Sequence, residues 1–144
     1  MKAYADSLFN IVYTLKRGDD NGAPIYLNMD QPYAGVLKEP GDFALFKFKG
    51  GMFRFGGEDL RVSVINLSTS QALKIYVQPF NDTGLPPAKV QDYMFQNHNQ
   101  NYVLLSHKDP VLDLYGAFFV RVDYPLFTDG NAIRFRINVQ SGLD

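Results

Sequence analysis

The sequence predicts an all-β protein, a single antiparallel β-sandwich of eight or nine strands with at most one short helix, covering residues 1–144. Three observations support this fold class. Apolar and polar residues alternate along several short runs, turn-forming residues separate those runs, and aromatic residues make up 15% of the chain. Alternation is typical of strands buried on one face, and aromatic residues favour strands.

The clearest strand is the run from residue 132 to residue 140. Its apolar positions are Ile133, Phe135, Ile137 and Val139. Successive side chains of a strand face opposite sides of the sheet, so these four residues should enter the core. The arginines between them, Arg134 and Arg136, should point to solvent.

Other strands are expected at residues 8–15, 25–29, 43–49, 52–55, 60–67, 73–77, 102–106 and 115–124. Asn21 with Gly22, and Gly50 with Gly51, are typical of tight hairpin turns. Residues 30–41 carry two prolines and two glycines, which predict a crossing loop. Beyond the last strand, the predicted core consists of Val62, Val64, Leu73, Ile75, Val77, Phe118, Val120 and Val122.

The segment from residue 80 to residue 101 breaks this pattern. Pro86 and Pro87 exclude a central strand, and Pro87 could begin a short helix over residues 88–96. A run of six polar residues, 96–101, would end that helix. So long an irregular segment in a compact domain is usually functional. We therefore expect it to lie at the periphery and to contact a partner through Tyr93, Met94, Phe95 and His98.

A metal site is not expected. The chain has no cysteine and only two histidines, His98 and His107. Two imidazoles form a catalytic zinc site only with a further ligand, such as the carboxylate of Asp92 or Asp109, and the spacing matches no metal motif. We interpret both histidines as exposed loop residues and expect no cofactor.

Catalytic motifs are also missing from the sequence. A glycosidase needs two carboxylates across a cleft, and Asp113 and Asp123 are the least turn-like candidates. Both would more simply point outward from strands. No nucleophile elbow or phosphate-binding loop is present. The sequence therefore predicts a protein that is not an enzyme.

Basic residues concentrate in the predicted strands, whereas the acids lie mostly in turns. These cations are Lys47, Lys49, Arg54, Arg61, Lys74, Arg121, Arg134 and Arg136. They could simply protect sheet edges and keep the sheet soluble. If they gather on one outer face, they could instead bind an anionic protein surface, a polysaccharide or nucleic acid. Phe53 and Phe55 beside Arg54 would suit a single-stranded nucleic acid.

The N-terminal residues lack the apolar core and cleavage site of a signal peptide, and no segment is apolar enough to span a bilayer. The net charge of -1 provides no overall attraction for nucleic acid or membrane. We therefore expect a soluble protein that is made in a cytoplasm.

Two alternating strands, VSVINL at residues 62–67 and LKIYV at residues 73–77, are followed by the long proline-bearing loop. With the strand-rich chain as a whole, they resemble the small jelly-roll proteins of virions, such as the decoration (cement) proteins of tailed-phage capsids. The resemblance implies a jelly-roll-like sandwich, a homo-oligomer (trimer or dimer), and a place in the virion clamping neighbouring capsid subunits. The alternative is a carbohydrate- or nucleic-acid-binding β-module. The expected partner contacts are Tyr93, Met94, Phe95, His98, Arg134 and Arg136.

Overall fold

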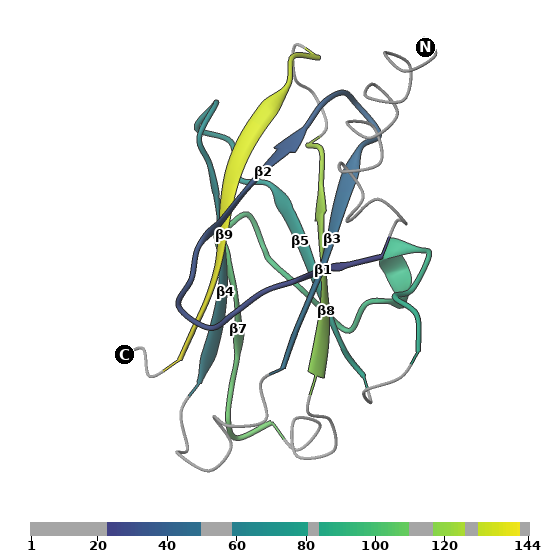
Figure 1. The fold of residues 1–144 in the computed structure, drawn as a ribbon, viewed down its shortest axis with the longest axis vertical. Helices are drawn as coiled ribbons and strands as arrows, with labels where there is room; N and C mark the ends of the chain where they lie inside the picture. Colours follow the sequence, from purple (N-terminus) through teal and green to yellow (C-terminus); the bar gives the residue numbers. More distant parts are fainter. Residues whose placement is uncertain (1–22, 50–58, 81–83, 110–116, 126–129, 142–144) are drawn as a thin grey trace, which may run out of the picture.

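The computed structural model describes residues 23–49, 59–80, 84–109, 117–125 and 130–141. Its strands are β1 (Ile25–Tyr26), β2 (Tyr33–Leu37), β3 (Phe43–Lys49), β4 (Leu60–Asn66), β5 (Lys74–Phe80), β6 (Phe95–Gln96), β7 (Tyr102–Leu105), β8 (Ala117–Asp123) and β9 (Ile133–Ser141). They form two sheets that face each other, with strand orders β1-β3-β8-β5-β6 and β2-β9-β4-β7 (Figure 1). The predicted all-β sandwich is confirmed.

The antiparallel strand pairs are nested along the chain. β2 pairs with β9, β3 with β8, β4 with β7, and β5 with β6. The chain from β2 to β9 therefore forms one long antiparallel hairpin, whose successive strand pairs lie alternately in the two sheets. This is the strand order of a jelly roll, which agrees with the predicted jelly-roll-like arrangement.

β1 departs from the antiparallel pattern. It pairs in parallel with β3, with Ile25 opposite Phe46, and the N–H of Leu27 continues the pairing by donating to the carbonyl of Lys47 at 2.8 Å. The sequence predicted a longer strand, 25–29, in a hairpin with residues 8–15. Only Ile25–Tyr26 is a strand, and its partner among the described residues is β3. The predicted strands 8–15 and 52–55 and the glycine turn between β3 and β4 lie outside the described residues.

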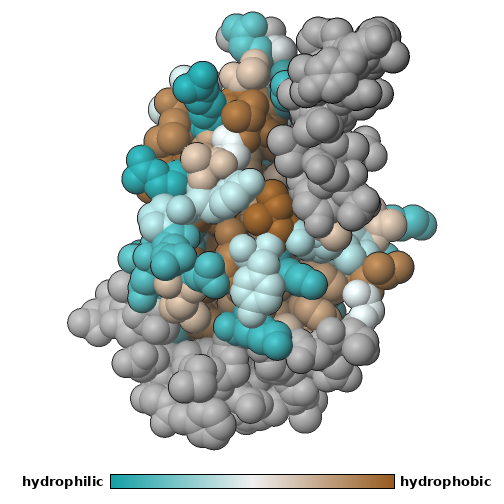
Figure 2. All heavy atoms as spheres, in the orientation of Figure 1, coloured by the Kyte–Doolittle hydropathy of each residue, from teal (hydrophilic) through white to brown (hydrophobic). Residues whose placement is uncertain are grey.

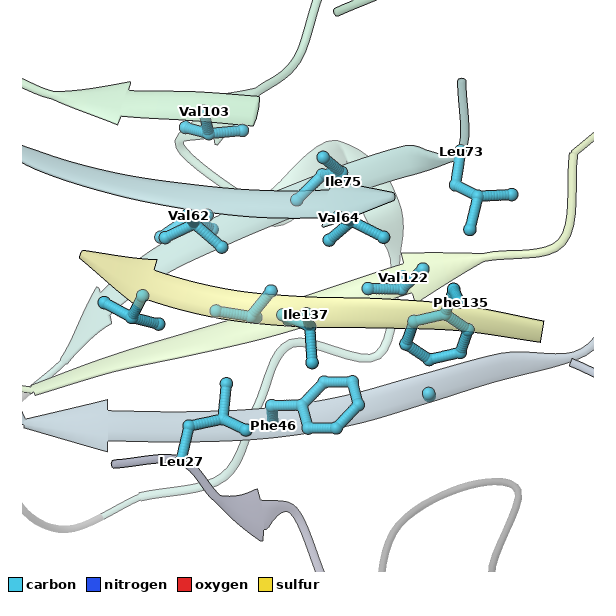
Figure 3. Close-up of a cluster of buried hydrophobic side chains, with 14 of the residues drawn as sticks. Leu27, Phe46, Val62, Val64, Leu73, Ile75, Val103, Val122, Phe135 and Ile137 are labelled. Atoms are coloured by element: carbon cyan, nitrogen blue, oxygen red, sulfur yellow. The ribbon is translucent and has the colours of Figure 1, made fainter. Parts of the chain in front are cut away.

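The core lies between the two sheets. All twelve residues predicted to be core are at most 2% exposed. Figure 3 shows side chains from both sheets, among them Val62 and Ile137 from one and Ile75 and Val122 from the other, meeting in this space. Period-two alternation therefore identified the buried face of each of these strands.

The predicted crossing loop at residues 30–41 is wrong, because residues 33–37 form β2. This strand pairs with β9, and Gly35 lies opposite Phe135. A Cβ atom on Gly35 would overlap the aromatic ring of Phe135. The glycine that indicated a loop is thus a packing requirement inside a strand.

The predicted helix over residues 88–96 is also wrong. Only a single 3-10 turn forms, η1 (Val90–Asp92), and its N-cap, Lys89, provides no side-chain cap. Tyr93 is already extended, with φ -88° and ψ 135°, and β6 then pairs with the edge of β5, Gln96 opposite Tyr76. Hydrogen bonding to a sheet edge has overridden the local preference for helix. Within the described ranges, no helix has the length and apolar character that a membrane crossing requires.

Candidate functional site

The outer face of the β2-β9-β4-β7 sheet carries three arginines. Arg134 and Arg136 lie on β9 and are exposed, and Arg61 lies on β4 and is half-buried. Residues flanking them in sequence are buried, so alternation directs the three guanidinium groups outward. The guanidinium carbon of Arg61 lies 4.4 Å from the centre of the Tyr102 ring, a cation–π contact that holds this side chain against the sheet.

Exposed aliphatic side chains lie between these arginines. Across the sheet, Arg134 is flanked by Val36 on β2 and by Leu67, whose N–H donates to the Arg134 carbonyl at 2.8 Å. The next row along the strands contains Ala34, Arg136 and Ile65. Leu104 on β7 lies opposite Arg61. We call this surface the arginine face: Arg61, Arg134 and Arg136 with Val36, Ile65, Leu67 and Leu104, the four aliphatics being 39–50% exposed.

No ion pair joins these three guanidinium groups to a carboxylate in the part of the chain that the structure describes. Two polar atoms of the same face, Arg61 Nε and Asn138 Oδ1, are buried and have no hydrogen-bond partner among the described residues. In Figure 2, hydrophilic and hydrophobic residues lie side by side along the left margin, on the side where β9, β4 and β7 lie in Figure 1. The face is therefore cationic and apolar together.

The remaining strand cations do not join this surface. Lys47, Lys74 and Arg121 belong to the opposite sheet, as does Lys49 at the end of β3. The strand cations are therefore divided between the two sheets, and of those in the described residues only Arg61, Arg134 and Arg136 share the arginine face. Arg54, with Phe53 and Phe55, lies outside the described residues.

Arg121 is fully engaged by its own neighbours. Its Nε donates to Asp123 Oδ1 at 2.6 Å, its guanidinium group lies 4.0 Å from the centre of the Phe43 ring, and Nη1 donates to the carbonyl of Ala88 at 3.3 Å. Burial raises the pKa of Asp123, although Arg121 opposes this shift. Asp123, a candidate catalytic acid, is thus the partner in an ion pair that fastens the loop at Ala88 to the sheet. Asp113 lies outside the described residues.

The loop before β6 packs onto this second sheet through Tyr93. The Tyr93 side chain is only 8% exposed, its ring centre lies 5.9 Å from that of Tyr76, and its hydroxyl donates to the Pro87 carbonyl at 3.2 Å. Burial raises the pKa of Tyr93 to about 12, so the hydroxyl remains a donor near neutral pH. Tyr93 therefore offers a partner little surface and mainly anchors the loop.

The other predicted contacts of this loop differ in exposure. Met94 is 52% exposed, and its N–H donates to Gln78 Oε1 at 2.8 Å. Phe95 packs partly against the core, and His98 is exposed. The six predicted partner residues thus form two groups, one on this loop and Arg134 with Arg136 on the other sheet. Their role in binding a partner stays a prediction.

The sequence reasoning missed Asn97, which is buried. Its Oδ1 accepts the N–H of Ile75 at 2.9 Å, and its Nδ2 donates to the carbonyls of Leu73 and Gln100, each at 2.7 Å. The side chain thereby continues the pairing of β6 along the edge of β5. Nothing in a run of six polar residues distinguishes Asn97 from its neighbours.

His107 binds a carboxylate at one end of the arginine-bearing sheet. Its Nδ1 lies 2.7 Å from Asp59 Oδ1, and its backbone N–H donates to the same oxygen at 2.9 Å. These hydrogen bonds lower the pKa of Asp59 below the ordinary value of 3.8. No group of three or more metal-binding side chains exists among the described residues.

The Asp59–His107 contact should make stability depend on pH. A carboxylate whose pKa is lowered in the folded state stabilises that state above its unfolded pKa, and the contribution is lost as the pH falls through the folded pKa. Asp59→Asn should therefore be less stable than wild type near neutral pH, and the difference should shrink below pH 3.8. Denaturant unfolding of both proteins across pH measures this. A difference that grows in acid would contradict it.

No protein-family model matches the sequence, and no curated protein matches it. Among solved structures, the chain is similar to the pre-peptidase C-terminal domain of collagenase from Bacillus anthracis. The identity is 12% and the TM-score 0.48, with 79% of this chain and 91% of that chain covered. A similarity of this size carries no argument about function, which must come from the surfaces described above.

Proposed function

We propose that this chain is a non-enzymatic structural protein that docks onto a larger protein assembly through the arginine face. In its specific form, the proposal is a homo-oligomeric virion component of the capsid decoration type. The observation that supports docking is the arginine face itself, where three arginines, unpaired with any carboxylate of the described residues, alternate with exposed aliphatic side chains. A contiguous exposed surface of this kind is typical of protein interaction sites.

The best-fitting partner is a protein surface that combines carboxylates with apolar side chains. Arg134 and Arg136 can each bind a carboxylate through two parallel hydrogen bonds, while Val36 and Ile65 bury against apolar groups. Arginine is enriched in such interfaces. Single-stranded nucleic acid would need exposed aromatic rings. Among the described residues that point outward on this face, the aromatic one is Tyr102, and its ring is already covered by Arg61.

The same charges constrain the homo-oligomer that we propose, a dimer or trimer. Two arginine faces placed against each other would bring like charges together, which is unfavourable. The contact between copies should therefore use another surface. Sedimentation of the double variant Arg134→Glu, Arg136→Glu should give the same oligomer mass as wild type, and a change to monomer would contradict this assignment.

The docking proposal can be tested with particles from the source that encodes the chain. Mass spectrometry of gradient-purified assemblies first asks whether the chain sediments with them. Particles lacking the chain are then mixed with purified protein, and the bound fraction is measured. The double variant Arg134→Glu, Arg136→Glu should bind about tenfold or more weakly, since two attractions become repulsions. The control Lys47→Glu, Lys89→Glu makes the same charge change away from the arginine face and should bind as wild type.

Each outcome has a distinct meaning. A chain that sediments only as free protein would overturn the proposed function. Binding that is lost in the lysine control and kept in the arginine variant would move the docking site to the other sheet. Tight, salt-dependent binding to an oligothymidylate that requires Arg134 and Arg136 would favour the nucleic-acid alternative. Unchanged circular dichroism and melting of both variants establishes that the fold is intact.

A further inference from the structure

A groove of about 300 Å³ lies at the end of the sandwich where β9 begins. Residues 71–74, Asn97, Asn99 and Pro125 line it. They belong to the connections β4–β5, β6–β7 and β8–β9 and to the start of β5, which the strand order brings together. The volume is at the lower end of the range for small-ligand pockets. None of the lining residues belongs to the arginine face.

The walls of this groove are held in place by side chains. Asn66 Oδ1 accepts the N–H groups of Ser68 and Thr69 at 2.8 and 2.9 Å, and its Nδ2 donates to the Gln71 carbonyl at 3.0 Å. Asn97 fixes the opposite wall through its three hydrogen bonds. The site is therefore preformed, and ligand binding requires little ordering of the loops.

The lining offers a cation and an amide to a ligand. Lys74 is exposed, and in the described residues no carboxylate pairs with it, since Asp123, its register partner on β8, is held by Arg121. The side chain of Asn99 is exposed and has no hydrogen bond within the described part of the chain. Among the lining residues that the structure describes, there is no acid and no aromatic ring. It therefore suits a carboxylate flanked by peptide groups better than a sugar ring or a base, which would stack on an aromatic residue.

We propose that this groove binds an acidic peptide segment. The ammonium group of Lys74 pairs with a carboxylate of the peptide, and the amide of Asn99 hydrogen-bonds to its backbone. This site is separate from the arginine face and does not depend on the proposed function, so either can fail alone.

The test is a two-dimensional amide NMR titration of the full chain with a blocked peptide of two glutamates flanked by glycines. We expect shifts at residues 71–74 and at Asn97 and Asn99, with a Kd on the order of 1 mM. The same peptide with glutamines in place of glutamates should bind more weakly. Lys74→Gln should weaken binding about threefold to fivefold, the range of an exposed ion pair, whereas Lys47→Gln should leave it unchanged.

Several results would overturn the proposal. Shifts centred on Arg134 and Arg136 would place the peptide on the arginine face instead. Equal binding of the glutamine peptide, or equal effects of the two lysine variants, would remove the role of Lys74. Shifts in the groove caused by glucuronate and not by the peptide would assign the site to an acidic sugar. Asn99→Gly, which removes the amide and tolerates the positive φ of this residue (66°), should weaken peptide binding while leaving the fold intact, and unchanged binding would remove the role of Asn99.

Discussion

Replacing Ile137 by alanine should lower the free energy of unfolding by about 2–5 kcal/mol. Ile137 lies on β9 in the centre of its sheet and is fully buried, with Val64 and Tyr33 as its register partners. Truncation removes apolar contacts and leaves a cavity that the surrounding strands can only partly close. Denaturant unfolding, with an unchanged dependence on denaturant concentration, measures the loss.

Ile65 provides a matched control on the adjacent strand. It lies opposite Arg136 and is about half exposed on the arginine face. Ile65→Ala should therefore change stability by about 0.5 kcal/mol or less. In partner binding the order should be reversed: Ile65→Ala should weaken binding, whereas Ile137→Ala should not. Equal destabilisation by both would mean that β4 and β9 do not have the register described, because a slip by one residue turns each side chain to the other face.

Replacing Asn97 by alanine should also be strongly destabilising, by about 1–3 kcal/mol for each buried backbone group left without its partner. The buried groups are the N–H of Ile75 and the carbonyl of Leu73, whereas the carbonyl of Gln100, at an exposed residue, can hydrogen-bond to water instead. Thermal or denaturant unfolding measures the change. His98→Ala, one residue away at an exposed position without a side-chain hydrogen bond in the described chain, should have almost no effect.

A second substitution separates the two kinds of hydrogen bond at this position. Asn97→Asp keeps an oxygen for the N–H of Ile75 but loses both donors, and it places a carboxylate opposite two carbonyl oxygens. It should be at least as destabilising as Asn97→Ala near neutral pH and should recover in part when acid protonates the carboxyl group. If Asn97→Ala and His98→Ala have equal effects, the buried hydrogen bonds of Asn97 do not hold the edge of β5.

Most of the fold could be predicted because the alternation of apolar and polar residues directly indicates which face of a strand is buried. β9 follows that rule from Ile133 to Gln140, and on β4 the rule identified Val62 and Val64 as core, although the apolar Ile65 beside them is exposed. β2 failed because Gly35 and the nearby prolines are also loop formers, and only the ring of Phe135 explains why a glycine is needed there. β6 failed because two residues pairing with a sheet edge leave no periodic pattern.

The candidate site could be predicted only in part. Alternation placed Arg134 and Arg136 outside the core, but sequence alone could not tell that Arg121 is neutralised by Asp123 while these two pair with no acid of the described segments. The neighbours Tyr93 and Met94 are a second example, since Tyr93 is buried and Met94 is exposed. Such differences depend on contacts between distant strands, which a single sequence does not encode in any local pattern.

The nested strand pairing has a consequence for synthesis of the protein. β9 lies between β2 and β4 in the sheet, so neither β2 nor β4 can complete its pairing until β9 has left the ribosome. Contacts so distant in sequence also form slowly. β9 also supplies Arg134 and Arg136. A chain cut before β9 therefore lacks two of the three arginines of the arginine face and should fail to dock in the way that we propose.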